Sequence, residues 1–234
     1  MTTMPLSTAP SDVPAADGAA PYLDVRHLVK EFPVTKGAVL RRRVGSVHAV
    51  SDITFSVMPG ETFGLVGESG CGKTTTGRMI VALEPPTSGS IVIAGEDIAT
   101  MSSREVRPRR RHMQMMFQDP YASLDPRMRV ATILREPMAI QGIGARDDQF
   151  DRVAELLNDV GLARGAMDRY PHEFSGGQRQ RIGLARALAL QPRLIVADEP
   201  VSALDVSIRS QILNLMNRLQ SKYQLTYVII SHDL

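Results

Sequence analysis

A glycine-rich segment in the first third of the chain has the residue types needed to hold phosphate. Residues 67–74 read GESGCGKT, which fits a glycine, any four residues, Gly-Lys and then Ser or Thr. Glycines let several backbone N–H groups face one point, and a following helix adds its positive N-terminal end. Lys73 then suits the β- and γ-phosphates of a nucleoside triphosphate, and the Thr74 hydroxyl suits Mg²⁺. The predicted phosphate-binding residues are Gly67, Glu68, Ser69, Gly70, Cys71, Gly72, Lys73, Thr74 and Thr75.

Two adjacent carboxylates, Asp198 and Glu199, directly follow the apolar run at residues 194–197. Such a run indicates a buried strand, and ligands bind at the carboxyl ends of the strands of a parallel sheet. We expect Asp198 to hold Mg²⁺ through water and Glu199 to polarise an attacking water as a general base. The metal and Lys73 would balance two buried acids that are costly without a cation. The alternative is a helix N-cap or a surface turn.

These residues need a framework, which hydrophobic periodicity and turn residues predict. Strands are expected at residues 22–29, 53–57, 62–66, 194–197 and 225–230, with another strand or hairpin from residue 91. Helices are expected at residues 73–83, 130–141, 149–160, 178–190 and 208–220. Residues 34–47 indicate a loop or hairpin extension, and residues 102–162 indicate mostly helix. This alternation predicts an α/β fold, in which helices flank a parallel sheet and the helical middle is an inserted lobe.

Composition narrows the class of protein. The chain has 234 residues, of which 43% are hydrophobic and 22% charged, and its net charge of +2 gives no reason to expect a nucleic acid partner. The single cysteine, Cys71, excludes an internal disulfide and fits a reducing cytosol. No apolar run approaches the ~20 residues that cross a bilayer, so a membrane role is expected to be peripheral. Residues 1–21 are predicted to be a disordered tail without the features of a signal peptide.

A second candidate anion site begins at Ser175, where Ser-Gly-Gly-Gln opens a predicted helix. This segment resembles the signature motif of the ATP-binding cassette family, with Phe174 in place of the usual leucine. The resemblance covers residues 22–234 and implies a nucleotide-binding domain. It implies that Gln118 reaches Mg²⁺ and the attacking water, that Asp205 belongs to a loop linking two active sites, and that His232 contacts the γ-phosphate.

The same resemblance implies a fold, cofactors and a dimer. The fold would be an α/β P-loop NTPase cassette with a parallel-sheet core, an antiparallel β subdomain and an inserted α-helical lobe at about residues 119–175. ATP and Mg²⁺ are the implied cofactors, with Thr74, Gln118 and Asp198 around the metal. In the implied head-to-tail dimer, the signature residues of one subunit cap the ATP of the other. These residues are Ser175, Gly176, Gly177 and Gln178. Phe32 matches the position where an aromatic ring stacks on adenine, and a core residue is the alternative.

The segment QDPYASLDP at residues 118–126 resembles the oligopeptide and dipeptide importer ATPases. That group implies a second ATPase subunit, two transmembrane permease subunits and, indirectly, an extracytoplasmic binding protein. It also implies a peripheral place on the cytoplasmic face of the cell membrane. Nickel and glutathione importers share these motifs and stay open as alternatives. A soluble cassette protein that acts on ribosomes or DNA, and an exporter motor, are further alternatives.

Three features leave more than one interpretation open. Cys71 is either a reactive thiol or a small residue at a tolerant position. A basic cluster is either a solvated face or a contact with anionic lipid or a permease. Its residues are Arg104, Arg107, Arg109, Arg110 and Arg111. The chain ends two residues after His232, where family members continue, so we expect a truncated domain that is poorly stable or inactive by itself.

Overall fold

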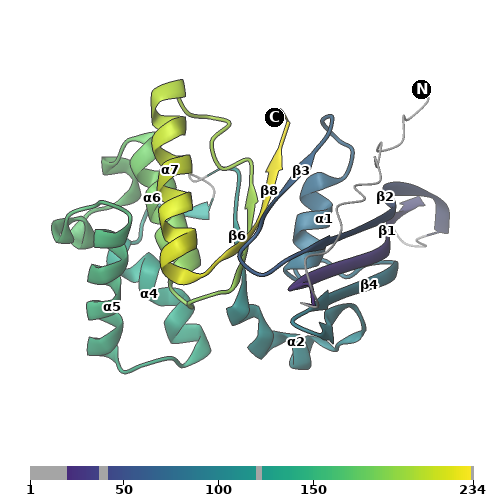
Figure 1. Cartoon of the computed structure of the whole chain (residues 1–234), viewed down its shortest axis with the longest axis horizontal. Coiled ribbons are helices and arrows are strands. Elements are labelled where there is room, and N and C mark those ends of the chain that lie inside the picture. The colour runs from purple at the N-terminus through teal and green to yellow at the C-terminus, as the bar shows by residue number, and fades with distance from the viewer. Residues whose placement is uncertain (1–19, 37–41, 120–122, 233–234) are drawn as a thin grey trace.

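The computed structural model describes residues 20–36, 42–119 and 123–232, without the side chains of residues 35, 36, 42 and 43 (Figure 1). Four segments lie outside this description: residues 1–19 of the predicted tail, residues 37–41 of the predicted loop or hairpin extension, residues 120–122 of the segment 118–126, and the chain end at residues 233–234.

A parallel sheet forms the centre of the described part of the chain, in the order β3-β8-β7-β6. Its strands are β3 (Thr62–Val66), β6 (Met113–Met116), β7 (Leu194–Asp198) and β8 (Thr226–Ser231). Every residue of β7 is buried, as expected of a central strand in a sheet with both faces covered. The carboxyl ends of β3, β7 and β8 lie together at the upper edge of the sheet in Figure 1.

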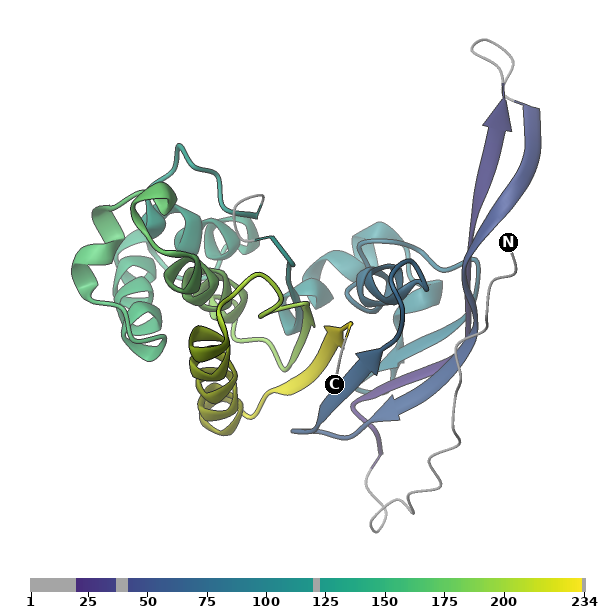
Figure 2. The same ribbon diagram turned by 90° about the horizontal axis from the view of Figure 1, so that it is seen from above.

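An antiparallel sheet packs beside the parallel one, in the order β2-β1-β4-β5 within the described residues. Its strands are β1 (Leu23–Lys36), β2 (Arg42–Val57), β4 (Ser88–Ile93) and β5 (Glu96–Asp97). The C-terminal part of β1 and the N-terminal part of β2 pair as a two-stranded ribbon that projects from the rest of the molecule (Figure 2). The extension expected at residues 34–47 is therefore a hairpin rather than a loop.

Helices supply the remaining layers. The longer ones are α1 (Lys73–Ile80), α2 (Ser103–Arg109), α4 (Val130–Gln141), α5 (Arg146–Asp159), α6 (Gly176–Leu188) and α7 (Val206–Tyr223). Short 3₁₀ turns are η1 (Ile98–Thr100), η2 (Arg110–His112), η3 (Arg164–Asp168) and η4 (Pro171–Glu173). Helices α4, α5 and α6 group at one side of the parallel sheet, at the left of Figure 1; α4 and α5 lie inside the range of the expected helical lobe, and α6 lies after it.

The prediction that residues 102–162 are mostly helical is wrong at one place, because β6 lies inside that range. Its sequence, MQMM, has neither the β-branched residues nor the clear alternation that mark a strand. Pairing with β7, from Met113 opposite Leu194 to Met116 opposite Ala197, determines its conformation. Tertiary pairing therefore overrides local propensity here.

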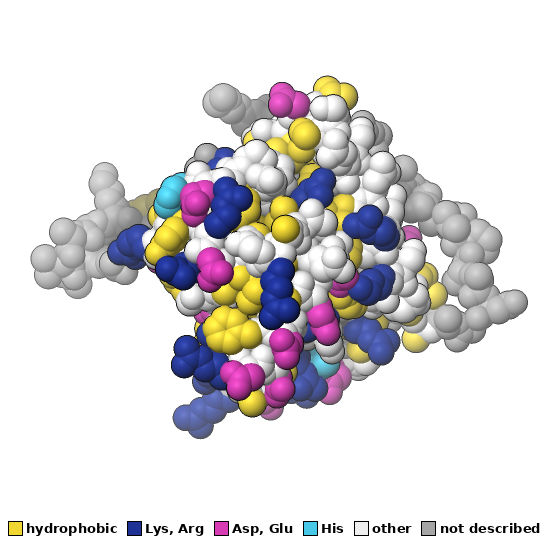
Figure 3. Space-filling view, turned by 90° about the vertical axis from the view of Figure 1, so that its left-hand side faces the viewer, with side chains coloured by type: hydrophobic (Ala, Val, Ile, Leu, Met, Phe, Trp, Pro, Cys, Tyr) yellow, Lys and Arg dark blue, Asp and Glu magenta, His cyan; other side chains and the backbone are white. Residues whose placement is uncertain are grey.

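The core has two regions. One lies under the helical region and α7, whose predicted apolar face of Ile212, Leu215, Met216 and Leu219 is buried. The other lies between the two sheets and contains Leu23, Met79 and Ile91. Figure 3 views the outer face of the helical region, where basic, acidic and hydrophobic side chains are interspersed without a large patch of one charge. Among the described residues, no helix is both long enough and apolar enough to span a bilayer.

Candidate nucleotide site at the strand ends

The glycine-rich loop runs from the end of β3 into α1 and requires glycine at its last turn. Gly72 is the N-cap of α1 and has a φ of 97°, in the left-handed region that favours glycine. A Cβ built on Gly72 would lie 2.0 Å from the carbonyl oxygen of Ala49 in β2. The loop therefore packs directly on the antiparallel sheet.

Lys73 begins α1, and its side chain folds back over the loop. The residue is 6% exposed, and its Nζ donates to the carbonyl oxygens of Gly67 at 2.6 Å and Glu68 at 2.7 Å. The Cys71 sulfur lies 3.8 Å from the same nitrogen. The loop thus holds one ammonium group within its own curve, where an anion would meet it. Ser69 and Gly70 lie on the same loop, and Thr75 is in the first turn of α1.

Thr74 joins the loop to the end of β7. Its hydroxyl donates to Asp198 Oδ1 at 3.1 Å, although the two residues are 124 positions apart. Asp198 is 3% exposed. Burial raises the pKa of Asp198, the Thr74 hydrogen bond opposes that rise, and the neighbouring Glu199 charge adds to it. The pair places a hydroxyl and a carboxylate oxygen next to each other beside the phosphate loop.

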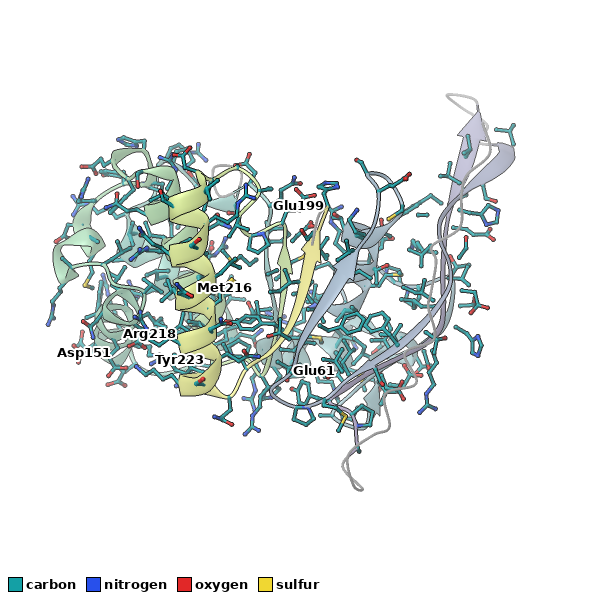
Figure 4. The ribbon with its side chains drawn as sticks, turned by 45° about the horizontal axis from the view of Figure 1, so that its top comes forward. Glu61, Asp151, Glu199, Met216, Arg218 and Tyr223 are labelled. Carbon is teal, nitrogen blue, oxygen red and sulfur yellow. The ribbon has the colours of Figure 1, made fainter. Side chains whose placement is uncertain are left out.

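Glu199 receives contacts from two other segments of the chain. Gln118, which follows β6, donates to Glu199 Oε2 at 2.7 Å, and His232, which follows β8, pairs its Nε2 with Glu199 Oε1. The backbone N–H of Glu199 donates to the carbonyl oxygen of Ile230 at 3.0 Å. The φ of Glu199 is 47°, which is unusual for a residue with a side chain. Figure 4 shows Glu199 at the carboxyl end of the parallel sheet. Three predicted catalytic residues therefore meet at one carboxylate, and neither acid is in an exposed turn.

The Ser-Gly-Gly-Gln segment caps α6. Ser175 Oγ accepts from the backbone of Gln178 at 3.3 Å, and the Gln178 side chain accepts from the backbone of Ser175 at 3.0 Å. A Cβ on Gly177 would lie 2.6 Å from Ile208 Cγ2 in α7, whereas one on Gly176 would make an ordinary contact of 3.5 Å. Phe174 is buried, and Arg169 lies 4.3 Å from its ring centroid. The larger ring that replaces leucine is thus packed inside the fold beside the start of α6.

A cavity of about 360 Å³ lies between this helix start and the end of β7. Its lining includes Gln118, Glu199 and Gly176. Gln180, which is 3% exposed, donates to the carbonyl oxygen of Pro200 at 2.6 Å and ties α6 to the segment after Glu199. The start of α6 therefore adjoins the general-base candidate of the same chain.

Asp205 and Phe32 lie near the surface. Asp205 is the exposed N-cap of α7, and its carbonyl oxygen accepts from Arg209 at 2.8 Å. Phe32, on β1, is 39% exposed, so the alternative of a simple core residue is wrong. Its stacking on adenine stays a prediction.

The basic cluster is largely engaged within the chain. Arg109 makes two contacts with the Glu96 carboxylate, Arg110 donates to the carbonyl oxygen of Ala82 at 2.7 Å, and Arg111 Nε lies 2.9 Å from a ring nitrogen of His112. Arg107 and Arg110 also line a cavity of about 540 Å³ between α2, β6, α4 and α6. The lining of this cavity, called the groove below, contains no phosphate-loop residue and shares Gln180 with the 360 Å³ cavity beside Glu199.

Sequence reasoning missed three structural supports of the site. Ala49 contributes a backbone carbonyl against Gly72, Gln180 connects α6 to Pro200, and Lys30 lies under Phe32. Gln180 lies between Arg179 and Arg181 in the sequence, so its neighbours give no signal that it is buried. Ala49 and Lys30 carry none, because a backbone carbonyl and a strand lysine are common everywhere.

Comparison with known proteins agrees with this geometry. The sequence profile of the family described as "ABC transporter" matches residues 50–202. The oligopeptide transport ATP-binding protein AppF of Bacillus subtilis is 52% identical over 213 residues, which are 91% of this chain and 64% of AppF. The glutathione import ATP-binding protein GsiA of Salmonella typhimurium is 53% identical over 214 residues, which are 92% of this chain and 34% of GsiA. The chain thus spans only part of these relatives.

A solved structure agrees as well. The dimeric post-hydrolysis state of the cassette MJ0796 bound to ADP and Pi has a TM-score of 0.77 at 27% sequence identity. The match covers 90% of this chain and 88% of that one.

Proposed function

The chain belongs to the ABC transporter family, and from this premise we propose that it binds ATP with Mg²⁺ and hydrolyses it to drive import of oligopeptides or dipeptides. The observation that carries the proposal is the meeting of Gln118 and His232 at the Glu199 carboxylate, next to the phosphate loop and the Thr74–Asp198 pair. Three segments that are distant in sequence supply these groups at one sheet edge.

The residues have separate roles in the proposed reaction. The loop N–H groups and Lys73 hold the β- and γ-phosphates, and the anion replaces the weak thiol contact of the ammonium at Cys71. Glu199 takes a proton from a water that attacks the γ-phosphorus, while the bond to the ADP oxygen breaks and ADP leaves with the electron pair. Gln118 and His232 orient that water and the γ-phosphate, since both already reach the Glu199 oxygens.

The donor set fits magnesium. Thr74 and Asp198 provide neighbouring hard oxygen atoms, 3.1 Å apart, and Gln118 adds an amide on the same side. Burial disfavours the negative charge of Asp198, and a cation beside it would stabilise the ionised carboxylate. When bound, Mg²⁺ supplies positive charge for the phosphate oxygens.

A second cassette completes the proposed site. Ser175 and Gln178 are exposed at the start of α6, and Asp205 is exposed at the start of α7, so a partner subunit can reach them. Ser175, Gly176 and Gly177 would offer the helix N-terminus to the partner's triphosphate. The dimer of MJ0796 is the supporting precedent.

The transport assignment rests on relatives. The name of AppF supports peptide cargo, and the name of GsiA supports glutathione as a second candidate. We assign the 540 Å³ groove, which is lined by apolar residues such as Leu83, Phe117 and Ile140, to a permease segment. This role implies two permease subunits, an extracytoplasmic binding protein, and a peripheral position on the cytoplasmic face of the membrane.

The variant Glu199→Gln tests the hydrolysis step. It keeps hydrogen-bonding capacity but removes the base, so we expect ATP binding near the wild-type level and hydrolysis slowed by about 10²–10⁴-fold. Release of phosphate and binding of a fluorescent ATP analogue are measured on the same samples. Wild-type hydrolysis by the variant would refute the role of Glu199.

A transport assay separates the two cargo candidates. Uptake of labelled dipeptide and uptake of labelled glutathione are measured in cells with and without the gene, and deletion of the gene should abolish uptake of the true cargo only.

A further inference from the structure

A buried lysine lies beneath the exposed aromatic ring of β1. The Lys30 side chain is 9% exposed, and its Nζ lies 4.8 Å from the Phe32 ring centroid. The same nitrogen pairs with Glu84 Oε1 at 2.6 Å and donates to the carbonyl oxygen of Pro85 at 2.6 Å. Phe32 itself keeps 39% of its surface exposed. Lys30 thus covers one side of a ring that still faces solvent.

Lys30 is also anchored to the segment that leaves the phosphate-loop helix. Thr87 connects this segment to β1 twice: its backbone N–H donates to Val29 at 2.8 Å, and its hydroxyl accepts from the N–H of Glu31 at 2.9 Å. These bonds flank Lys30 on both sides. A continuous path of contacts therefore runs from α1, through Glu84 and Pro85, to Lys30 and the Phe32 ring.

We propose that Lys30 is a positioning residue that holds the Phe32 ring as a platform for the purine base of the nucleotide. The inference rests on the proposed function, since it requires a nucleotide on the phosphate loop. Lys30 touches neither base nor phosphate in this role. It acts through Phe32 and determines where the ring lies relative to α1.

The physical basis is the geometry of the ammonium. A buried ammonium needs close partners, and the Glu84 carboxylate and the Pro85 carbonyl supply them. The remaining attraction is to the ring face, which a cation contacts favourably within about 6 Å. This attraction restricts the ring and leaves its opposite face for stacking on a planar base. A phosphate chain without a base gains nothing from this arrangement.

The experiment compares affinities for ATP and for inorganic tripolyphosphate on the purified protein. We expect Lys30→Met to weaken ATP binding by about three- to tenfold, in line with a cation–π contact between the exposed and the fully desolvated cases, and to leave tripolyphosphate affinity unchanged. Lys30→Arg keeps the cation and should restore most of the ATP affinity. In a Phe32→Ala background, Lys30→Met should have no further effect, because its route to the base is gone.

Lys222→Met is the matched control. Lys222 pairs with Asp159 at 2.5 Å and lies 5.3 Å from the Tyr223 ring centroid, so it repeats the cation, carboxylate and ring on α7. It should leave both affinities unchanged. The ratio of the two affinities does not depend on the folded fraction, and Lys30→Gln provides a second neutral variant if Lys30→Met does not fold.

Two results overturn the inference: unchanged ATP affinity in the neutral variants, or an equal loss for ATP and tripolyphosphate. Failure of the proposed function gives a different result. In that case the wild-type protein itself shows no preference for ATP over tripolyphosphate.

Discussion

Alanine at Gly72 should damage the protein far more than alanine at Gly70, although both glycines lie on the same loop. Both have left-handed backbones, with φ of 97° at Gly72 and 81° at Gly70. A Cβ on Gly70 meets nothing within 4 Å, whereas one on Gly72 lies 2.0 Å from Ala49 O and 3.0 Å from Val50 Cγ2. Comparing the two alanine variants therefore separates the cost of backbone strain from the cost of a steric clash with β2.

The magnitudes follow from these distances. Alanine in a left-handed backbone conformation destabilises the fold by roughly 1 kcal/mol, and this applies to both variants. Real Cβ contacts lie beyond 3.0 Å, so Gly72→Ala must displace the loop or β2 by about 1 Å. Overpacking against a backbone adds about 1–3 kcal/mol. We therefore expect roughly 1 kcal/mol for Gly70→Ala and roughly 3 kcal/mol for Gly72→Ala.

Thermal unfolding followed by circular dichroism measures the difference. For a domain of this size, 1 kcal/mol shifts the midpoint by roughly 2–4 °C, so Gly72→Ala should lower it by roughly 6–12 °C and Gly70→Ala by roughly 2–4 °C. Gly72→Ala should also weaken ATP binding, because the loop that cradles phosphate is the element that moves. Equal midpoint shifts for the two variants would refute the packing of the loop on β2.

Two further predictions concern the same site. Burial raises the pKa of Asp198 above its unfolded value, so ionisation of Asp198 destabilises the folded protein as the pH rises through that raised pKa. Asp198→Asn should remove this destabilisation, stabilise the protein at pH 7 and abolish Mg²⁺-dependent hydrolysis. A midpoint of urea unfolding below that of wild type at pH 7 would contradict this prediction. The Cys71 sulfur lies 3.8 Å from Lys73 Nζ, so alkylation of Cys71 should block ATP hydrolysis, and bound ATP should slow the alkylation. Full ATPase activity after complete alkylation, checked by mass spectrometry, would show that the thiol does not lie next to the nucleotide.

Prediction from the sequence was strongest where local signals agree. The apolar run at 194–197 and the glycine-rich loop after 62–66 predicted β7, β3 and the start of α1 closely, since strand, turn and helix signals coincide there. The strand β6 was missed because Met113–Met116 has no local signal of its own and depends on its pairing with β7.

By itself, the sequence determined the local conformation and chemical groups of single segments. These are the glycine-rich loop at residues 67–74, the two acids that follow a buried run, and the serine that caps α6. Tertiary structure alone decided which of these segments meet. Gln118 reaches Glu199, and Thr74 reaches Asp198, across 81 and 124 positions. Gly72 packs on Ala49, and Lys30 lies under Phe32. Periodicity reports only which face of an element is buried, whereas these contacts depend on the strand order β3-β8-β7-β6 and on how the second sheet packs against it.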